Sequence, residues 1–203
     1  MWLRRVAVGV NVAAVVLAAG GGSRFVGATH KLLAEIDGQP VVTHSVLAAV
    51  EAGFDHVLVV TGAVGLDDVL PAGVEVVTNP RWAEGLATSL QAGIERARTL
   101  GCDAVVVGLG DQPFVGAADW RAVAATDTTP LAAADRGDHL ATPVRIAAEC
   151  WSELPTDGDV GARVLLARRP DLVTAVSCTG RPDDIDTVAD IANCTDPRPT
   201  DLT

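Results

Sequence analysis

Short, mostly apolar runs rich in valine recur along the chain, separated by longer segments that mix alanine, leucine and polar residues. The clearest runs occupy residues 12–17, 56–61, 74–78 and 103–109. Such short runs are typical of strands buried on both faces of a parallel sheet. The intervening residues 40–50 and 84–100 favour helices, which Gly53 and Gly101 are predicted to end. This alternation predicts a three-layer α/β domain with a mostly parallel central sheet.

Beyond residue 110 the alternation of predicted strands and helices is weaker, but it continues. Residues 130–134, 142–146 and 172–176 are predicted strands, residues 160–168 a predicted helix, and a short helix is expected after Thr187. The last residues, TDPRPTDLT, are polar and rich in proline, which is typical of a frayed end. We therefore predict one domain over residues 1–193 and a flexible tail over residues 194–203.

Composition narrows the classes of protein and partner. A chain of 203 residues fits one domain, and 49% hydrophobic with only 3% aromatic residues implies a core of Ala, Val and Leu. The formal net charge of −11 argues against a nucleic-acid partner, because binding a phosphate backbone requires a basic face. No apolar run is long enough to span a bilayer, so we expect no membrane partner.

The N-terminal residues and the cysteines indicate whether the protein is secreted or cytoplasmic. MWLRR followed by an apolar stretch is similar to a signal peptide, but Asn11 interrupts the stretch and cleavage would fall inside a glycine-rich loop. The four cysteines form no C-x-x-C pair and match no common zinc spacing. Reduced thiols in a cytoplasmic protein are the expected state.

The most informative segment is the loop after the first strand, LAAGGGSRFVGATHKLL over residues 17–33. It carries Lys31, the single lysine of a chain that has fourteen arginines, and also Arg24. Glycines allow close approach of the backbone to a ligand, and two cations can offset the charge of a phosphate chain. A flexible turn followed by a solvated lysine is the alternative, but the pattern favours a phosphate site.

Two common phosphate motifs fit this loop only in part. Gly22 and Gly27 have the glycine spacing of a P-loop, but Ala28-Thr29 stands where Lys-Ser/Thr is required. In the dinucleotide pattern G-x-G-x-x-G, Gly20 and Gly22 fit, but position 25 is phenylalanine. We set both interpretations aside.

A third pattern fits throughout the chain. The loop L-A-A-G-x-x-S-R with its following lysine resembles the signature of the MobA-like nucleotidyltransferases, which include cytidylyl- and guanylyltransferases of molybdenum cofactor maturation. Further resembling segments are NPRWAEGLATSL at 79–90, GDQPF at 110–114, GDVGAR at 158–163 and DIDT at 184–187. Five motifs in order resemble one family, which implies a Rossmann-like nucleotidyltransferase domain. The loop is one residue longer than usual after Arg24, and Ala141-Thr142 replaces a Gly-His pair.

The resemblance implies the roles of individual residues. Lys31, Arg24 and Asp111 are the expected catalytic residues. Asp111 and Asp186 are the expected Mg²⁺ ligands, since hard carboxylate oxygens suit that ion. The expected nucleotide-binding residues are Leu17, Ala18, Ala19, Gly20, Gly21, Gly22, Ser23, Arg24, Lys31, Gly85, Ser89 and Gly110.

Other roles stay open at this point. Asp111 could instead stabilise a turn, and Asp186 could cap the last helix. Asp159 and Arg163 are candidates for holding the acceptor, or they could form a surface ion pair. The histidines show no ligand spacing, and we interpret them as structural or exposed.

The implied function is a Mg²⁺-dependent transfer of a nucleoside monophosphate, CMP in the branch that this chain most resembles, to a phosphorylated acceptor. The expected partners are a nucleoside triphosphate, a phosphorylated pterin-type acceptor such as molybdopterin, and a client molybdoenzyme. Three alternatives remain: a GTP-using guanylyltransferase, a nucleotide-binding accessory protein for molybdoenzyme maturation, and a nucleotide-dependent oxidoreductase on the same fold.

Overall fold

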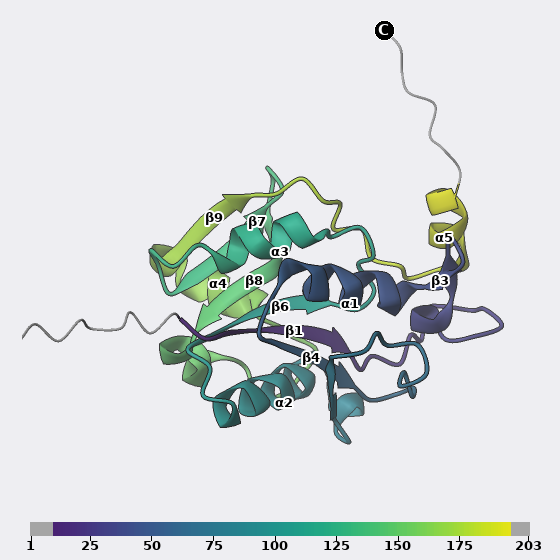
Figure 1. Cartoon of the computed structure of the whole chain (residues 1–203), viewed down its shortest axis with the longest axis horizontal. Coiled ribbons are helices and arrows are strands. Elements are labelled where there is room, and N and C mark those ends of the chain that lie inside the picture. The colour runs from purple at the N-terminus through teal and green to yellow at the C-terminus, as the bar shows by residue number, and fades with distance from the viewer. Residues whose placement is uncertain (1–9, 196–203) are drawn as a thin grey trace, which may run out of the picture.

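A seven-stranded sheet forms the centre of the molecule (Figure 1). The structure, a computed structural model, describes residues 10–195. The strand order is β5-β4-β1-β6-β8-β7-β9, and every pairing is parallel except the two made by β8. The bounds are β1 Val12–Ala18, β4 His56–Thr61, β5 Glu75–Thr78, β6 Ala104–Leu109, β7 Leu131–Asp135, β8 Leu140–Ala147 and β9 Val173–Ser177. This confirms the predicted mostly parallel sheet.

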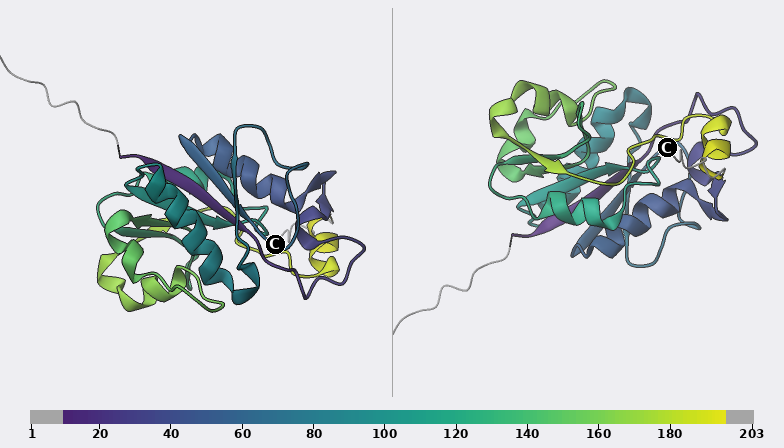
Figure 2. Two further views of the ribbon diagram at one scale, coloured as in Figure 1. Left: turned by 90° about the horizontal axis from the view of Figure 1, so that it is seen from below. Right: turned by 90° about the horizontal axis from the view of Figure 1, so that it is seen from above.

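Helices cover both faces of the sheet, so the architecture has three layers. The helices are α1 Val41–Ala52, α2 Leu86–Thr99, α3 Ala117–Ala124, α4 Arg163–Arg168 and α5 Val188–Thr195. Helices α1 and α3 lie on one face, and α2 lies on the other (Figures 1 and 2). The short 3₁₀ helices are η1 Lys31–Leu33, η2 Trp82–Glu84, η3 Ala148–Glu153 and η4 Pro170–Leu172.

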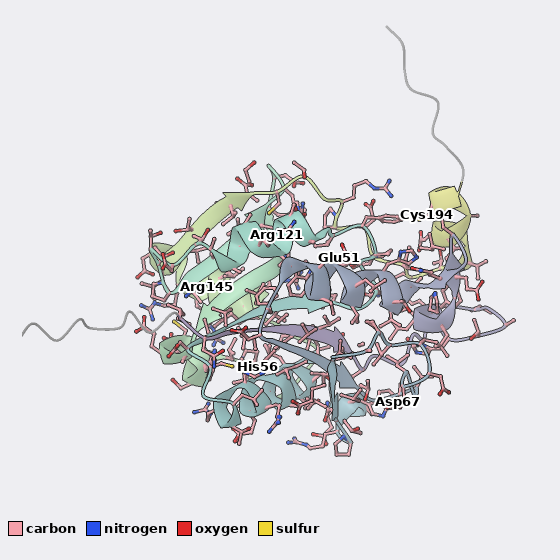
Figure 3. The ribbon with its side chains drawn as sticks, in the orientation of Figure 1. Glu51, His56, Asp67, Arg121, Arg145 and Cys194 are labelled. Carbon is pink, nitrogen blue, oxygen red and sulfur yellow. The ribbon has the colours of Figure 1, made fainter. Side chains whose placement is uncertain are left out.

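Alternation along the strands divides the core into two large clusters. In β1, Val15 belongs to the cluster that includes residues of α2 and α4, whereas its neighbour Val16 belongs to the cluster that includes residues of α1 and α3. Both valines are fully buried, at 0% exposure, because each strand has a helical layer on either side. The α1–α3 layer is further tied by Arg121, whose guanidinium donates to the main-chain oxygen of Glu51 at 2.8 Å (Figure 3).

A smaller feature lies beyond the ends of β1 and α1. The two-residue strands β2 Glu35–Ile36 and β3 Gln39–Pro40 form an antiparallel hairpin. Helix α5 packs beside this hairpin, as both views of Figure 2 show, although the two are far apart in sequence. The C-terminal end of the described chain therefore returns to the loop that follows β1.

The structure differs from the sequence prediction at several boundaries. Helix α2 begins at Leu86 rather than at 84, because Gly85 has φ +117° and the preceding residues form η2. Helix α4 begins at Arg163 rather than at 160. The prediction missed α3, a short helix held to the sheet by the buried side chains of Trp120 and Val123.

Helix α5 runs to Thr195, past the expected domain boundary at residue 193. The rest of the expected tail, residues 196–203, lies outside the described residues. Within residues 10–195, no helix is both long enough and apolar enough to cross a membrane.

Gly93 lets α2 approach the sheet closely. A Cβ at this position would lie 2.5 Å from Cγ1 of Val15, a buried atom with no room to move. Alanine gains about 1 kcal/mol of helix propensity over glycine, but overpacking a filled core costs about 1–3 kcal/mol. We expect Gly93→Ala to lower the free energy of unfolding, as measured by urea denaturation. Gly65→Ala, where the added methyl meets open space, should leave it within about 0.5 kcal/mol.

Candidate active site

The site lies where the carboxyl ends of β1 and β6 meet. Strands β4 and β5 extend the sheet on one side of β1, and β6 extends it on the other side. The gap between the ends of β1 and β6 is therefore the switch point at which parallel sheets bind ligands. The strands close together there, because the Gly110 amide donates to the Leu17 carbonyl at 2.9 Å. A Cβ on Gly110 would lie 2.9 Å from Cβ of Ala18, so glycine is required for this approach.

The glycine loop leaves β1 at this point and is held by contacts along its length. Gly22 has φ +60°, and its carbonyl accepts from the Phe25 amide at 2.9 Å, which turns the chain. The ring of His30 lies 3.1 Å from the Gly20 carbonyl through Nε2, and its Nδ1 accepts from the Leu32 amide at 3.3 Å. The loop is thus anchored at both ends, with Gly20 facing open space.

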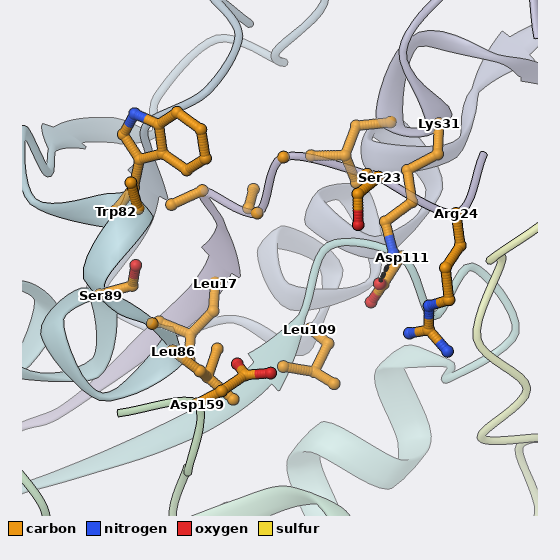
Figure 4. Close-up of a pocket in the computed structure, with 18 of the residues that line it drawn as sticks. Leu17, Ser23, Arg24, Lys31, Trp82, Leu86, Ser89, Leu109, Asp111 and Asp159 are labelled. Carbon is orange, nitrogen blue, oxygen red and sulfur yellow. Dashed lines mark hydrogen bonds and ion pairs between the residues drawn. The ribbon is translucent and has the colours of Figure 1, made fainter. Parts of the chain in front are cut away.

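Lys31 is the centre of the site. Its ammonium donates to Oδ2 of Asp111 at 2.6 Å and to Oδ1 of Asp186 at 3.1 Å (Figure 4 shows the first contact). Arg24 reaches the other oxygen of Asp186 at 3.0 Å. The two carboxylates lie 75 positions apart in sequence, and the fold brings them to one cation.

The contacts decide the protonation state of Lys31. Burial by itself lowers the pKa of the ammonium, but the charge of Asp111 and hydrogen bonds from both carboxylates act in the opposite direction and prevail. The pKa of Lys31 is therefore raised, and the side chain is charged at neutral pH.

A cleft of about 590 Å³ opens beside this network. Most of the predicted nucleotide-binding residues line it (Figure 4). These are Leu17, Ala18, Ala19, Gly20, Gly21, Gly22, Ser23, Arg24, Lys31, Gly85 and Ser89, together with Asp111. Gly110 is not among the lining residues; its main-chain groups are engaged by Leu17 and Ser45, so it acts through packing.

The segment from Asn79 to Ser89 forms the opposite wall. Asn79 is buried, and its amide nitrogen donates to the hydroxyls of Thr88 at 2.9 Å and Ser89 at 3.0 Å, which fixes the first turn of α2. The Trp82 ring backs Gly21, where an added Cβ would lie 3.0 Å from it. From the sequence, Trp82 of the NPRW motif could either pack in the core or edge the pocket, and the structure places it in the lining of the cleft.

A second cavity of about 340 Å³ adjoins the cleft. Asp159 lines both, and Arg163 lines only the second. The lining residues shared with the first are apolar apart from Asp159: Leu17, Leu86 and Leu109. Asp159 therefore lies at the junction of the two spaces, and Arg163 lies in the second cavity beside the cleft.

Gln112 connects the second cavity to the aspartate segment. Its amide donates to Oδ1 of Asp184 at 2.8 Å and to the Pro182 carbonyl at 3.2 Å, and its oxygen accepts from the Thr142 hydroxyl. Thr142 stands in the place where the resembled family often has histidine.

Burial raises the pKa of Asp184, and the charge of Asp111 raises it further. The sequence interpretation left Gln112 and Thr142 without a role.

The donor set at Lys31 fits a divalent cation of the Mg²⁺ type. Mg²⁺ is commonly held by one or two carboxylates and completed by water and substrate phosphates. Asp111 and Asp186 both place an oxygen within 3.1 Å of a single cationic atom, so their spacing suits such an ion. No group of three or more Asp, Glu, His or Cys side chains in residues 10–195 could hold a metal by itself. Water would therefore complete the shell in the free protein, and substrate oxygens would replace part of it when the nucleotide is bound.

Comparison with known proteins identifies the family and the fold. A family model described as the MobA-like NTP transferase domain matches residues 14–173, most of the chain. The chain belongs to this family, and it is a nucleotidyltransferase by fold and domain. A nucleotidyl transferase from Methanothermobacter thermautotroptrophicus superimposes with a TM-score of 0.76 at 27% identity, covering 92% of this chain and 97% of that one.

Among curated relatives, nicotine blue oxidoreductase from Paenarthrobacter nicotinovorans is 28% identical over 206 residues, 87% of this chain and 93% of that protein. The bifunctional enzyme IspD/IspF from Maricaulis maris is 35% identical over 111 residues, 53% of this chain. The chain spans only 29% of that bifunctional enzyme.

The His30 contacts predict a pH dependence. Burial lowers the pKa of the imidazole, and the neutral ring accepts from Leu32 through Nδ1. The unfolded chain thus binds a proton more readily than the folded one, so stability should fall as pH drops below about 6.5 towards the lowered pKa. Denaturation across this range, with a nuclear magnetic resonance titration of the ring, measures the effect. His30→Asn keeps a capping oxygen and should lose this pH dependence.

Proposed function

We propose that this protein is a Mg²⁺-dependent cytidylyltransferase that moves CMP from CTP to a phosphorylated pterin-type acceptor, such as molybdopterin, and releases pyrophosphate. The observation that carries the proposal is the meeting of Asp111 and Asp186 at Lys31 on the rim of the glycine loop. The choice of CTP and of a pterin acceptor rests on the resemblance of the LAAG and GDVGAR segments to the molybdenum cofactor cytidylyltransferases.

The charges of the cleft favour a metal requirement. Two positive side chains, Arg24 and Lys31, line it together with three carboxylates, those of Glu84, Asp111 and Asp159. Asp186 adds a fourth at its edge, and both cations already pair with carboxylates. A triphosphate entering this cleft meets net negative charge, so its binding requires an added cation. When bound by Asp111 and Asp186, Mg²⁺ supplies that charge and polarises the phosphate oxygens.

The reaction is an in-line displacement at the α-phosphorus. An oxygen of the acceptor phosphate attacks the α-phosphorus, the bond from that phosphorus to its bridging oxygen breaks, and pyrophosphate carries away the electron pair. The glycine amides can approach the phosphate chain, and Lys31 and Arg24 offset the charge that develops on the leaving group. A phosphate acceptor is already ionised at neutral pH, so the transfer requires no general base.

The second cavity is the proposed acceptor site. It adjoins the cleft through Leu17, Leu86 and Leu109, so a molecule in it can reach the α-phosphate of a nucleotide in the first. Arg163 provides a cation for the acceptor phosphate, and the apolar lining suits a flat ring system. Asp159 lies at the junction of the two spaces.

One rival function has a specific observation in its favour, namely the full-length similarity to a protein named nicotine blue oxidoreductase. Binding of CTP, GTP and NADPH, each titrated with and without Mg²⁺, separates the two. The transferase proposal expects CTP to bind with Mg²⁺ and to yield pyrophosphate with molybdopterin. Tight binding of NADPH and of neither triphosphate would contradict it, and a preference for GTP would correct the nucleotide.

Removing either member of the Lys31–Asp111 ion pair, the shortest in the site, should abolish most turnover. We expect Lys31→Ala and Asp111→Asn each to lower kcat by roughly a hundredfold or more, because each removes charge stabilisation at the reacting centre. Pyrophosphate release under saturating substrates measures the change. Arg168→Ala, which removes an exposed charge on α4, is the control and should turn over like the unaltered chain. Normal kcat in either site variant would refute that residue's role.

Asp186→Asn should change metal dependence more than fold. The amide keeps the shape of the side chain but removes its negative charge, so we expect the Mg²⁺ concentration for half-maximal activity to rise about tenfold or more. Thermal unfolding should show the variant folded. Asp183→Asn, three residues earlier and paired with Arg181, is the matched control. An unchanged Mg²⁺ titration in Asp186→Asn would remove this residue from the metal site.

A further inference from the structure

A third, small apolar cluster lies behind the charged network, apart from the two large clusters of the core. Its buried members are Ile36, Val41 and Ile185. Partly buried side chains pack against them: Phe25, Phe114, Ile191 and Cys194. The cluster joins five separate segments, which are the glycine loop, the β2–β3 hairpin with the start of α1, the GDQPF loop, the DIDT segment and α5.

The members of this cluster are sequence neighbours of the charged residues. Phe25 follows Arg24, Ile185 precedes Asp186, and Phe114 lies three residues after Asp111. Ile185 and Asp186 are adjacent, but their side chains have different surroundings: Ile185 is buried in the cluster, whereas the Asp186 carboxylate accepts from Lys31 at 3.1 Å. Burial of Ile185 therefore fixes the chain directly beside the carboxylate that meets Lys31.

The main chain around Asp186 is held on both sides of the residue. The Ile185 amide donates to the Asp111 carbonyl at 2.9 Å, which links the two proposed metal ligands directly through the backbone. On the other side, Oδ2 of Asp190 accepts from the amides of Asp186 at 3.0 Å and Thr187 at 2.7 Å. Residues 178–187 have no helix or strand of their own, so these contacts replace a regular ladder.

We propose that Ile185 is a positioning residue for the metal site: its burial in the third cluster sets the register of Asp186 against Asp111 and Lys31. The inference rests on the proposed function, since it presumes a cation between the two carboxylates. Its physical basis is burial, because the side chain is 1% exposed in a segment that otherwise lacks secondary structure. A smaller side chain leaves space into which the segment can shift, and Asp186 then moves with it.

The test compares the same substitution at two equally buried isoleucines. Ile185 is 1% exposed and Ile146 is 0% exposed, but Ile146 pairs with Val105 near the start of β6, at the end of the sheet away from Asp111. Ile→Ala and the milder Ile→Val are made at both positions. Two quantities are measured: the urea midpoint of unfolding, and the affinity for Mn²⁺ read from its electron paramagnetic resonance signal, which needs no substrate or turnover.

We expect both positions to lose stability, but only the Ile185 variants to bind Mn²⁺ more weakly. The Kd should rise roughly tenfold for Ile185→Ala, with Ile185→Val between it and the unaltered chain, as expected for a residue that supports a metal ligand. Unchanged Mn²⁺ affinity in Ile185→Ala, despite lost stability, would overturn the positioning role alone. If the unaltered chain bound no Mn²⁺, or if Asp186→Asn bound it equally well, the metal assignment itself would fail, and this inference with it.

Discussion

An ammonium held between two carboxylates is the interaction on which the site depends. Lys31 is largely buried at the end of the glycine loop, where an unpaired charge is costly. Asp111 and Asp186 offset that cost, and they in turn avoid mutual repulsion because the ammonium lies between them. The three groups come from the loop after β1, the loop after β6 and the segment before α5. Their meeting therefore links parts of the chain that are distant in sequence.

Close packing of glycine makes that meeting possible. Gly110 lets β6 end against Ala18, which places Asp111 beside the loop, and Gly21 lets the loop lie on the ring of Trp82. Gly85, at φ +117°, approaches the Gly158 backbone so closely that a side chain would collide. That last contact joins the wall of the nucleotide cleft to the segment that carries Asp159. The glycines of these motifs thus serve packing between segments as well as access for a ligand.

Both polar and apolar contacts hold the irregular segment before α5, residues 178–187. Gln112 fixes Asp184 and Pro182 by hydrogen bonds, and Ile185 inserts into the third cluster. The same glutamine reaches Thr142 at the second cavity. A shift of this segment would consequently move Asp186 relative to Lys31 and would also change the lining of the second cavity, and several independent contacts oppose such a shift.

The sequence by itself determined the strands, most helices and the identity of the charged residues, since buried strands require apolar runs and phosphate chemistry requires glycine, cations and carboxylates in recognisable order. The motifs single out Lys31, Asp111 and Asp186, which the fold brings into contact. It missed α3, whose formation depends on Trp120 packing against the sheet. Only the tertiary structure decided that β8 runs antiparallel, that Gly110 packs rather than lines the cleft, and that Ile185 supports Asp186. Each of these is a contact between segments far apart in the chain, and local pattern carries no information about which distant segment a residue will meet.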